Sequence, residues 1–174
     1  MQSIETPRLI LRLPQASDAE ALLEIHEHPD VTKYVVTGAS PGGITGAWRS
    51  IATMLGHWQL RGYGQWTVVE KATGEIVGRV GLWNPEGWPG IELGWITRRS
   101  RWGEGFATEA ARASLEWAWS HTKANHIISI IDHDNVASIR VAEKIGETLE
   151  HTEDRNGMPV HTYGIRRPRL RTQN

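Results

Sequence analysis

The stretch from Ile91 to Trp119 constrains the fold more than any other part of the chain. It combines a short strand over Ile91–Thr97, a basic turn, a Gly-x-Gly corner and an amphipathic helix that runs to about Trp119. Apolar residues recur in this helix at i, i+4, i+7 and i+11, the spacing of one helical face: Phe106, Ala110, Ala113 and Trp117. We therefore expect a strand that turns sharply into a helix with one buried face.

The corner of this element has the features of an anion site. Gly103 and Gly105 carry no side chain, so a ligand can approach the main chain closely. The first turn of a helix offers unpaired N–H groups and a partial positive charge, which suit phosphate. Three arginines precede the corner: Arg98, Arg99 and Arg101. A glycine corner can also serve packing alone, and the corner by itself does not decide between the two roles.

Two familiar phosphate motifs do not fit the corner. A Rossmann fingerprint requires a third glycine where this chain has Thr108, and an acidic residue about 20 residues further on, which is missing. A P-loop requires Gly-Lys-Ser/Thr, which does not follow either. A nucleotide site of either type is therefore not indicated.

Composition sets wider limits. A chain of 174 residues with 39% apolar and 22% charged residues fits one domain over residues 1–174. The net charge of −1 does not indicate a nucleic-acid partner, and the absence of cysteine excludes disulfides and thiolate chemistry. Neither a signal peptide nor an apolar run of about 18 residues is visible, so we expect a cytoplasmic protein without a membrane partner. Residues 167–174 are expected to form a flexible basic tail.

The remaining elements follow from alternation, helical periodicity and turn residues. Strands are predicted at 8–13, 65–71, 76–83, 126–132, 147–154 and 158–166, and helices at 18–28, 44–60 and 136–145, with a loop at 30–46 that includes one helical turn near 32–34. Asn135 is a suitable N-cap for the helix at 136–145, which Gly146 can close. Hairpins combined with helices predict an α+β fold with a mixed, mostly antiparallel sheet.

Several segments together resemble the GNAT superfamily of acetyl-CoA-dependent N-acetyltransferases, in particular its RimJ/RimL-like, ribosomal-protein-type subgroup. The resemblance spans nearly the whole chain and rests on five segments: Thr6–Arg12 with Ser17–Ala19, Thr73–Gly78, Glu92–Trp95, Trp102–Ala110 and Asn135–Gly146. It implies a single GNAT domain with about four helices, in which the strands at 91–97 and 126–132 splay apart to form the cofactor cleft.

The resemblance implies acetyl-CoA as cofactor and transfer of its acetyl group to an amine. The family's pyrophosphate-binding pattern here reads Trp102-Gly103-Glu104-Gly105-Phe106-Ala107, followed by Thr108. Main-chain amides of this stretch would hold the pyrophosphate. Trp102 takes the place of the usual Gln or Arg, and Glu104 would repel phosphate unless it turns to solvent. Of the upstream arginines, Arg101 is assigned a phosphate contact.

The family also binds the pantetheine arm between the two splayed strands. Gly94 is expected to form a bulge in the first strand, because glycine tolerates unusual dihedral angles. The main chain of Trp95, Ile96 and Thr97 would then face the arm, and Asn135 would bind it from the other side. A plain N-cap role for Asn135 is equally possible, and both can hold at once.

Acetyl transfer requires a base for the amine and a group that protonates or stabilises the leaving thiolate. Glu92 occupies the position at which some family members carry the base, although an ion pair with a neighbouring element is an alternative role. The family's frequent acid, a tyrosine, is replaced here by Ala142, and Ser138 is the nearest substitute by position. The catalytic candidates are therefore Glu92 and Ser138.

The eight histidines form no compact ligand pattern, and no metal is expected; His133, between Asp132 and Asp134, lies nearest the expected cleft. The acceptor is an amine: a peptide or protein N-terminus or a small molecule. We expect a monomer or a homodimer. A non-catalytic acyl-CoA-binding regulatory module is the alternative function, favoured by Ala142.

Overall fold

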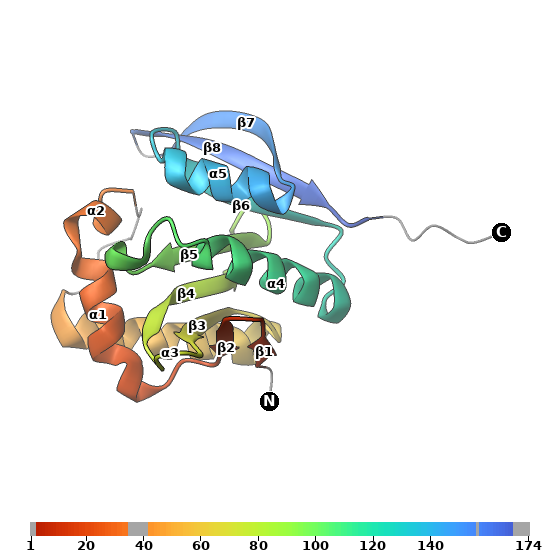
Figure 1. Ribbon diagram of the computed structural model, residues 1–174. Helices are drawn as coiled ribbons and strands as arrows, with labels where there is room; N and C mark the ends of the chain where they lie inside the picture. Colours follow the sequence, from red (N-terminus) through yellow and green to blue (C-terminus); the bar gives the residue numbers. More distant parts are fainter. Residues whose placement is uncertain (1–2, 35–41, 156, 169–174) are drawn as a thin grey trace.

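The computed structural model describes residues 3–34, 42–155 and 157–168. One sheet organises the described chain, and its strands follow the order β1-β2-β3-β4-β5-β6-β8-β7 (Figure 1). All neighbouring strands are antiparallel except β5 and β6. The strands are β1 Ile4–Glu5, β2 Leu9–Arg12, β3 Gln65–Glu70, β4 Ile76–Trp83, β5 Glu92–Thr97, β6 His126–Asp132, β7 Thr148–Arg155 and β8 Met158–Arg166.

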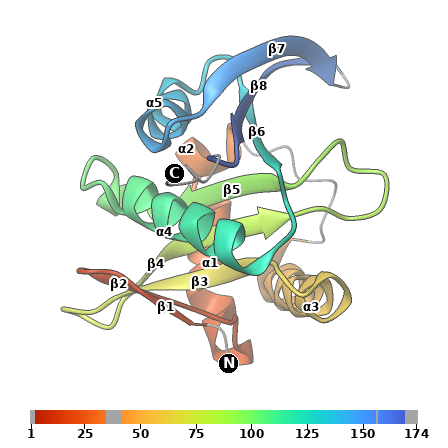
Figure 2. The same ribbon diagram turned by 90° about the vertical axis from the view of Figure 1, so that its right-hand side faces the viewer.

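Helices cover both faces of the sheet. Figures 1 and 2 show α4 and α5 on one side and α1 and α3 on the other, with α4 against β4 and β5. Two short 3-10 turns, η1 and η2, precede α1 and the glycine corner. The helical segments are η1 Ala16–Asp18, α1 Ala19–Glu27, α2 Pro29–Thr32, α3 Gly43–Arg61, η2 Arg99–Arg101, α4 Phe106–His121 and α5 Val136–Ile145.

The core lies between the sheet and α4, where the predicted apolar face of this helix is buried except at Ala113, which is half-buried. Phe106, Ala110 and Trp117 are at most 8% exposed. Trp58, Trp66 and Trp117 meet one another edge to face, with ring centroids 5.0 to 5.6 Å apart. Edge-to-face packing is a favourable arrangement for aromatic rings. Large indole side chains thus fill the centre of this domain.

The sheet divides between β5 and β6. These two strands form a single parallel pair, Glu92 with Ile128, and then separate. Figure 1 shows β6, β8, β7 and α5 turning away from β5. The expected splay is therefore confirmed. The expected bulge at Gly94 is wrong, because β4 and β5 pair without a register shift, and Gly94 lies opposite Gly81. Divergence of β6, not an irregularity in the β4–β5 ladder, opens the sheet.

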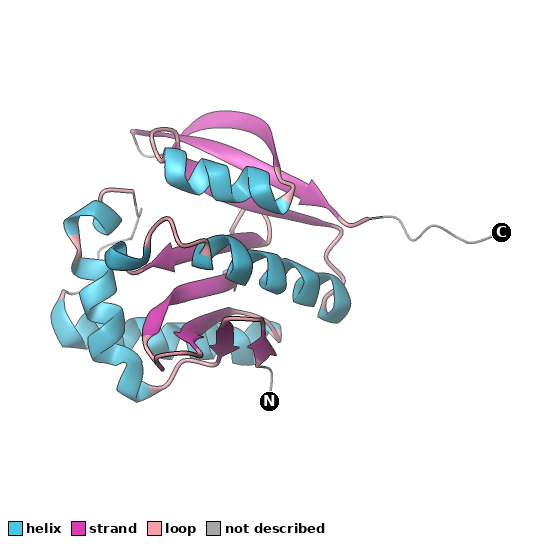
Figure 3. Cartoon of the chain, viewed as in Figure 1, coloured by secondary structure: helices cyan, strands magenta, loops and turns pink. Residues whose placement is uncertain are grey.

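The predicted elements agree closely with the observed ones (Figure 3). Every predicted strand and long helix is present, with ends that differ by at most two residues. The helical turn of the first long loop comes earlier than expected, at α2, because Pro29 ends α1 and is itself compatible with a first helical turn. Residues 35–41 of that loop, Asn156 of the final turn and residues 169–174 of the expected tail lie outside the described part. Arg167 donates to the carbonyls of Thr122 and Ala124.

Candidate active site

A cavity of about 280 Å³ lies where β5 and β6 separate, which we call the fork of the sheet. β5 and the glycine corner form one wall, the first turns of α5 form the opposite wall, and Asp30, Val31 and Tyr34 contribute from the α2 segment. Every residue that the sequence assigned to the cofactor lines this cavity, with the exception of Glu104. Residues from three separate parts of the chain therefore meet in one place.

The glycine corner presents a row of main-chain donors to the cavity. Gly103 and Gly105 have φ angles of +85° and +83°, which glycine adopts without strain. Within the described chain, the N–H groups from Gly103 to Thr108 donate to no protein acceptor, and the first amide beyond them, that of Glu109, bonds to Gly105 O. Six consecutive free donors at the start of a 16-residue helix fit a phosphate group.

An anchor formed by Thr6, Arg8 and Glu109 fixes this corner to the edge of the sheet. Glu109 accepts hydrogen bonds from the Thr6 hydroxyl at 2.6 Å and from the Arg8 main chain and side chain at 3.0 and 2.7 Å. Burial favours a higher pKa for Glu109, but these hydrogen bonds and the Arg8 charge outweigh it and lower the pKa. Arg8 also donates to Glu104 O. The anchor thus holds the glycine corner in place from outside the cavity.

The three arginines of the basic turn bind carboxylates of the protein. Arg98 pairs with Glu24 and Glu75, and Arg99 pairs with Asp30 at 2.7 Å. Arg101 lines the cavity, but it lies 2.6 Å from Glu70, and it also contacts Glu75 and Glu104. Carboxylates thus already neutralise these guanidinium groups. The donors that remain free at the corner are therefore mainly those of the main chain.

Glu104 and Trp102 are oriented so that neither opposes an anion. The Glu104 carboxylate lies 3.0 Å from Arg101 Nε and is not part of the cavity lining, so its charge is turned away and paired. Trp102 donates its indole N–H to Thr97 O at 2.9 Å, and the Arg99 guanidinium lies over its ring. Trp102 therefore ties the corner to the end of β5 and occupies one of the carbonyls that the sequence assigned to the pantetheine arm.

Asn135 and Ser138 begin the opposite wall. The Asn135 side-chain oxygen accepts the Ser138 N–H at 3.1 Å, which confirms the N-cap role. Asn135 lines the cavity, and its amide NH2 has no partner among the described residues. Ser138 Oγ accepts the Trp95 indole N–H at 3.2 Å. Since a hydroxyl that accepts one bond keeps its own hydrogen, Ser138 can still donate one to a ligand.

Two further cations face the cavity that the sequence did not assign to the cofactor. Arg140 and Lys144 lie on α5, one helical turn apart, and both line the cavity. Neither side chain is ion-paired within the described chain. The i, i+4 spacing of these two residues, shortly after Asn135, could have indicated from the sequence that both lie on one face of the helix. Without the tertiary structure, however, nothing showed that this face of α5 turns toward the glycine corner.

Glu92 lies on β5 at the point where β6 leaves it, but it is not part of the cavity lining. Its carboxylate accepts the Trp88 indole N–H at 2.7 Å, and it forms no ion pair within the described chain. Burial raises the pKa of Glu92, while the Trp88 bond and the charges of Arg155 and Arg79 offset part of this effect. Among the described residues, the alternative role of Glu92 as an ion-pair partner is thus limited to these charge interactions, without a direct pair.

Arg79 shares the sheet face of Glu92, since Arg79 pairs with Ile96 and Trp83 pairs with Glu92 in one continuous ladder. It donates to His26 Nε2 at 2.9 Å and to Gln65 Oε1. Burial and the Arg79 charge lower the pKa of His26 to about 3, so the imidazole is neutral and accepts this bond. Neutral partners hold Arg79 in place, and its charge acts on Glu92.

Ala142 replaces the family's tyrosine and is fully buried. It packs with Ile131 and Tyr163 in a small core cluster and does not line the cavity, although its neighbour Val141 does. Position 142 thus contributes no proton donor, which leaves Ser138 as the hydroxyl on this wall of the cavity.

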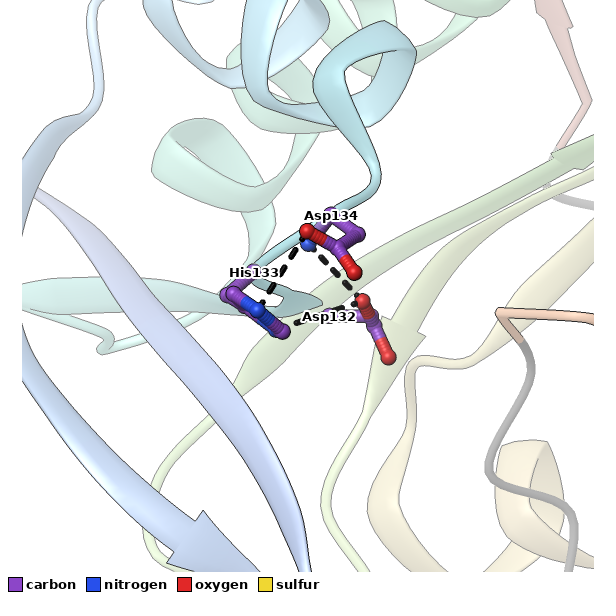
Figure 4. Close-up of side chains that lie close together, drawn as sticks. All are labelled: Asp132, His133 and Asp134. Carbon is purple, nitrogen blue, oxygen red and sulfur yellow. Dashed lines mark hydrogen bonds and ion pairs between the residues drawn. The ribbon is translucent and has the colours of Figure 1, made fainter.

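Asp132, His133 and Asp134 form the only group of three potential metal ligands within the described ranges (Figure 4). His133 lies 3.8 Å from Asp132 and 3.3 Å from Asp134, and Asp132 accepts the Asp134 N–H at 2.9 Å. These are contacts of the turn that leads from β6 to Asn135. The bond between Asp132 and the Asp134 N–H helps to shape the turn that presents Asn135.

The chain is similar to known acetyltransferases. Residues 8–148 match the acetyltransferase (GNAT) domain family. The YkkB protein of Bacillus subtilis is 33% identical over 166 residues, which cover 91% of this chain and 92% of that protein. The crystal structure of an acetyltransferase from Agrobacterium tumefaciens is 29% identical, with a TM-score of 0.83 and 96% and 95% of the two chains covered. RimL in complex with coenzyme A has the same fold, with 19% identity, a TM-score of 0.80 and coverage of 95% and 98%.

The chain therefore belongs to the GNAT family of acetyltransferases, and its structural neighbours include RimL and other ribosomal-protein acetyltransferases. It is an acyltransferase that uses acetyl-CoA, and acetyl transfer to an amine is general for the family. The site fits this cofactor, because free amides, the unpartnered Asn135 amide and two cations surround one cavity. No helix in the described part of the chain could cross a membrane.

Proposed function

We propose that this enzyme transfers the acetyl group of acetyl-CoA directly to a primary amine, without a covalent enzyme intermediate. The observation that carries the proposal is the arrangement of the fork. A phosphate-binding corner lies at one end of the cavity, a free hydroxyl at Ser138 lies on its far wall, and Glu92 stands where β5 and β6 part. The absence of cysteine from the chain supports direct attack, because no thiol nucleophile is available.

The cofactor would be held mainly by the main chain. The amides from Gly103 to Thr108 bind the pyrophosphate, Arg140 and Lys144 contribute positive charge, and the Asn135 amide donates to the pantetheine arm. When bound, acetyl-CoA supplies an acetyl group activated as a thioester. The cleft then fixes the position of this group relative to Glu92 and Ser138.

Glu92 would accept the proton that the attacking amine must lose. It does not line the cavity, so the proton passes through a water molecule. Burial raises its pKa and makes it a stronger base than an exposed glutamate, while the Trp88 hydrogen bond and the charges of Arg155 and Arg79 favour its carboxylate form. Ser138 would donate its free hydroxyl hydrogen to the departing sulfur, while Trp95 holds the oxygen from behind.

The acceptor would be a peptide or protein N-terminus or a small-molecule amine, and we place the enzyme in the cytoplasm as a monomer or homodimer. The relationship to RimL, a ribosomal L7/L12 alpha-N-protein acetyltransferase, supports an N-terminal amine as the first class to test. The alternative, an acyl-CoA-binding module without turnover, rests on the buried Ala142 at the tyrosine position.

A panel of amines tests the proposal. The purified enzyme is incubated with acetyl-CoA and peptides with free N-termini, polyamines, amino acids or aminoglycosides, and both free CoA and acetylated product are measured. We expect one class of amine to yield both products in equal amounts. CoA binding without turnover of any amine would favour the non-catalytic module.

A further inference from the structure

A second buried glutamate, Glu147, lies on the other side of the fork from Glu92. It follows α5 directly and is 3% exposed. Its Oε1 lies 3.0 Å from the hydroxyl of Ser129 on β6, and its Oε2 is buried without a hydrogen-bond partner. Buried polar atoms normally have partners, so an orphaned carboxylate oxygen requires an explanation.

The Ser129 hydroxyl also reaches across the fork. Ser129 Oγ lies 2.7 Å from Leu93 O on β5, next to the single Glu92–Ile128 pair. A regular parallel ladder would continue with Ile130 N–H donating to that carbonyl. The serine side chain takes this place, so it is the last link between β5 and β6 before they separate.

Counting hydrogens assigns the proton. A serine hydroxyl carries one hydrogen, and Leu93 O can only accept. For both short contacts to be hydrogen bonds, Ser129 must donate to Leu93 O, and Glu147 must supply the hydrogen between its own Oε1 and Ser129 Oγ. A carboxylate at this position would leave one of the two contacts without a hydrogen. It would also be a buried charge without a partner, which is costly.

The charged groups around Glu147 also favour its protonated, neutral form. Glu150 on β7 and Glu92 on β5 both act on Glu147 as negative charges, and the nearby His126 on β6 is bonded to Glu150. Burial, with these charges, outweighs the lowering effect of the Ser129 hydrogen bond and raises the pKa of Glu147 to about 8. No cation within the described chain pairs with Glu147.

We propose that Glu147 works as a neutral carboxylic acid, and that the chain Glu147–Ser129–Leu93 fixes the point at which the cofactor cleft opens. Glu147 is thus a positioning residue that acts through Ser129 on the main chain of β5, between Glu92 and the cavity residue Trp95. When Glu147 loses its proton, Ser129 turns to the carboxylate and releases Leu93 O. The inference concerns the cleft and is independent of which amine is the acceptor.

Binding of acetyl-CoA, measured by calorimetry between pH 7 and 9.5, tests the inference. We expect wild-type affinity to fall by about tenfold across this range, the equivalent of one lost hydrogen bond. Glu147→Gln should remove most of this fall, since its amide donates to Ser129 at every pH. Ser129→Ala at pH 7 should bind as weakly as the wild type at pH 9.5.

Glu116→Gln is the control, because it makes the same substitution at an exposed glutamate on α4. This variant should keep the wild-type dependence of acetyl-CoA affinity on pH. The carboxyl carbon signal of Glu147 in a 13C NMR titration, identified by its loss in Glu147→Gln, should titrate with a midpoint near 8. A midpoint below about 6, or an unchanged alkaline loss in Glu147→Gln, would overturn the inference. Neither readout requires turnover, so failure to find an acceptor amine leaves the test intact.

Discussion

The two ends of the cavity are built in different ways. The phosphate end consists of main-chain amides from Gly103 to Thr108, whose directions are set by backbone dihedral angles and by the anchor of Arg8 on Glu109. The proposed reacting end depends on single side chains, Ser138 in the cavity lining and Glu92 outside it, each held by one tryptophan. A backbone site depends on two glycines and tolerates many neighbours. A side-chain site can be altered by one substitution, as Ala142 illustrates.

The reacting end should give the largest effect on turnover. Glu92→Gln is expected to lower kcat by about 100- to 1000-fold, the usual contribution of a general base. Acetyl-CoA binding should remain unchanged, because Glu92 does not line the cavity. Steady-state kinetics and calorimetry on the same preparation separate the two quantities. Wild-type turnover in Glu92→Gln would rule out a base at this position.

The phosphate end should give the largest effect on binding. Gly105→Val forces a branched side chain into a φ of +83° and moves the amides, so acetyl-CoA affinity should fall roughly 10- to 100-fold. Gly62→Val imposes similar strain at φ +75° at the C-terminus of α3, where neither Gly62 nor its chain neighbours line the cavity. This control should lose stability but keep its affinity. Equal losses of affinity in both variants would show that strain, not the corner, is responsible.

The dependence of protein stability on pH tests whether Glu147 has a raised pKa in the folded protein. The folded pKa, about 8, lies above the ordinary value of 4.5, so the folded state binds more protons between these pH values. The free energy of unfolding therefore falls as pH rises through this window, and each pKa unit corresponds to about 1.4 kcal/mol. Glu147→Gln should melt higher than the wild type at pH 8, by about 4 °C or more. The difference should disappear near pH 4.5.

Substitution of Arg79 should change the pKa of Glu92 without altering Glu92 itself. Its charge lowers the pKa of Glu92, so Arg79→Met should raise that pKa further. Turnover, which requires the carboxylate, would then begin at higher pH, and we expect a shift of the acid limb of about one unit or less. Cofactor affinity should stay the same. A shift of the acid limb to lower pH would contradict the assignment of Glu92.

The smallest effect is expected at Arg99. Its side chain is exposed and paired with Asp30, and such surface pairs contribute little. Arg99→Gln should therefore change acetyl-CoA affinity by about twofold or less at physiological salt. A tenfold loss in calorimetry would mean that the basic turn, in addition to the main chain, binds the phosphates.

Local sequence signals predicted most of the elements of this fold. The continuous apolar run of β6, the cap at Asn135 and the turns at glycine and proline are properties of neighbouring residues, so they could be read in order along the chain. The glycine corner could also be found, because positive φ angles require a residue without a side chain. The prediction of a bulge at Gly94 was wrong, because bulges depend on strand pairing, which involves residues distant in the sequence.

The sequence by itself determined the elements, the glycine corner and the family of this acetyltransferase, because each depends on residue types at short spacing. Only the tertiary structure decided which charges are free. It paired Arg98, Arg99 and Arg101 with carboxylates, turned Arg140 and Lys144 toward the cavity, and buried Glu147 against Ser129. Whether a charged group binds a ligand or a neighbour depends on what lies beside it in space, and that is settled only when distant segments pack together.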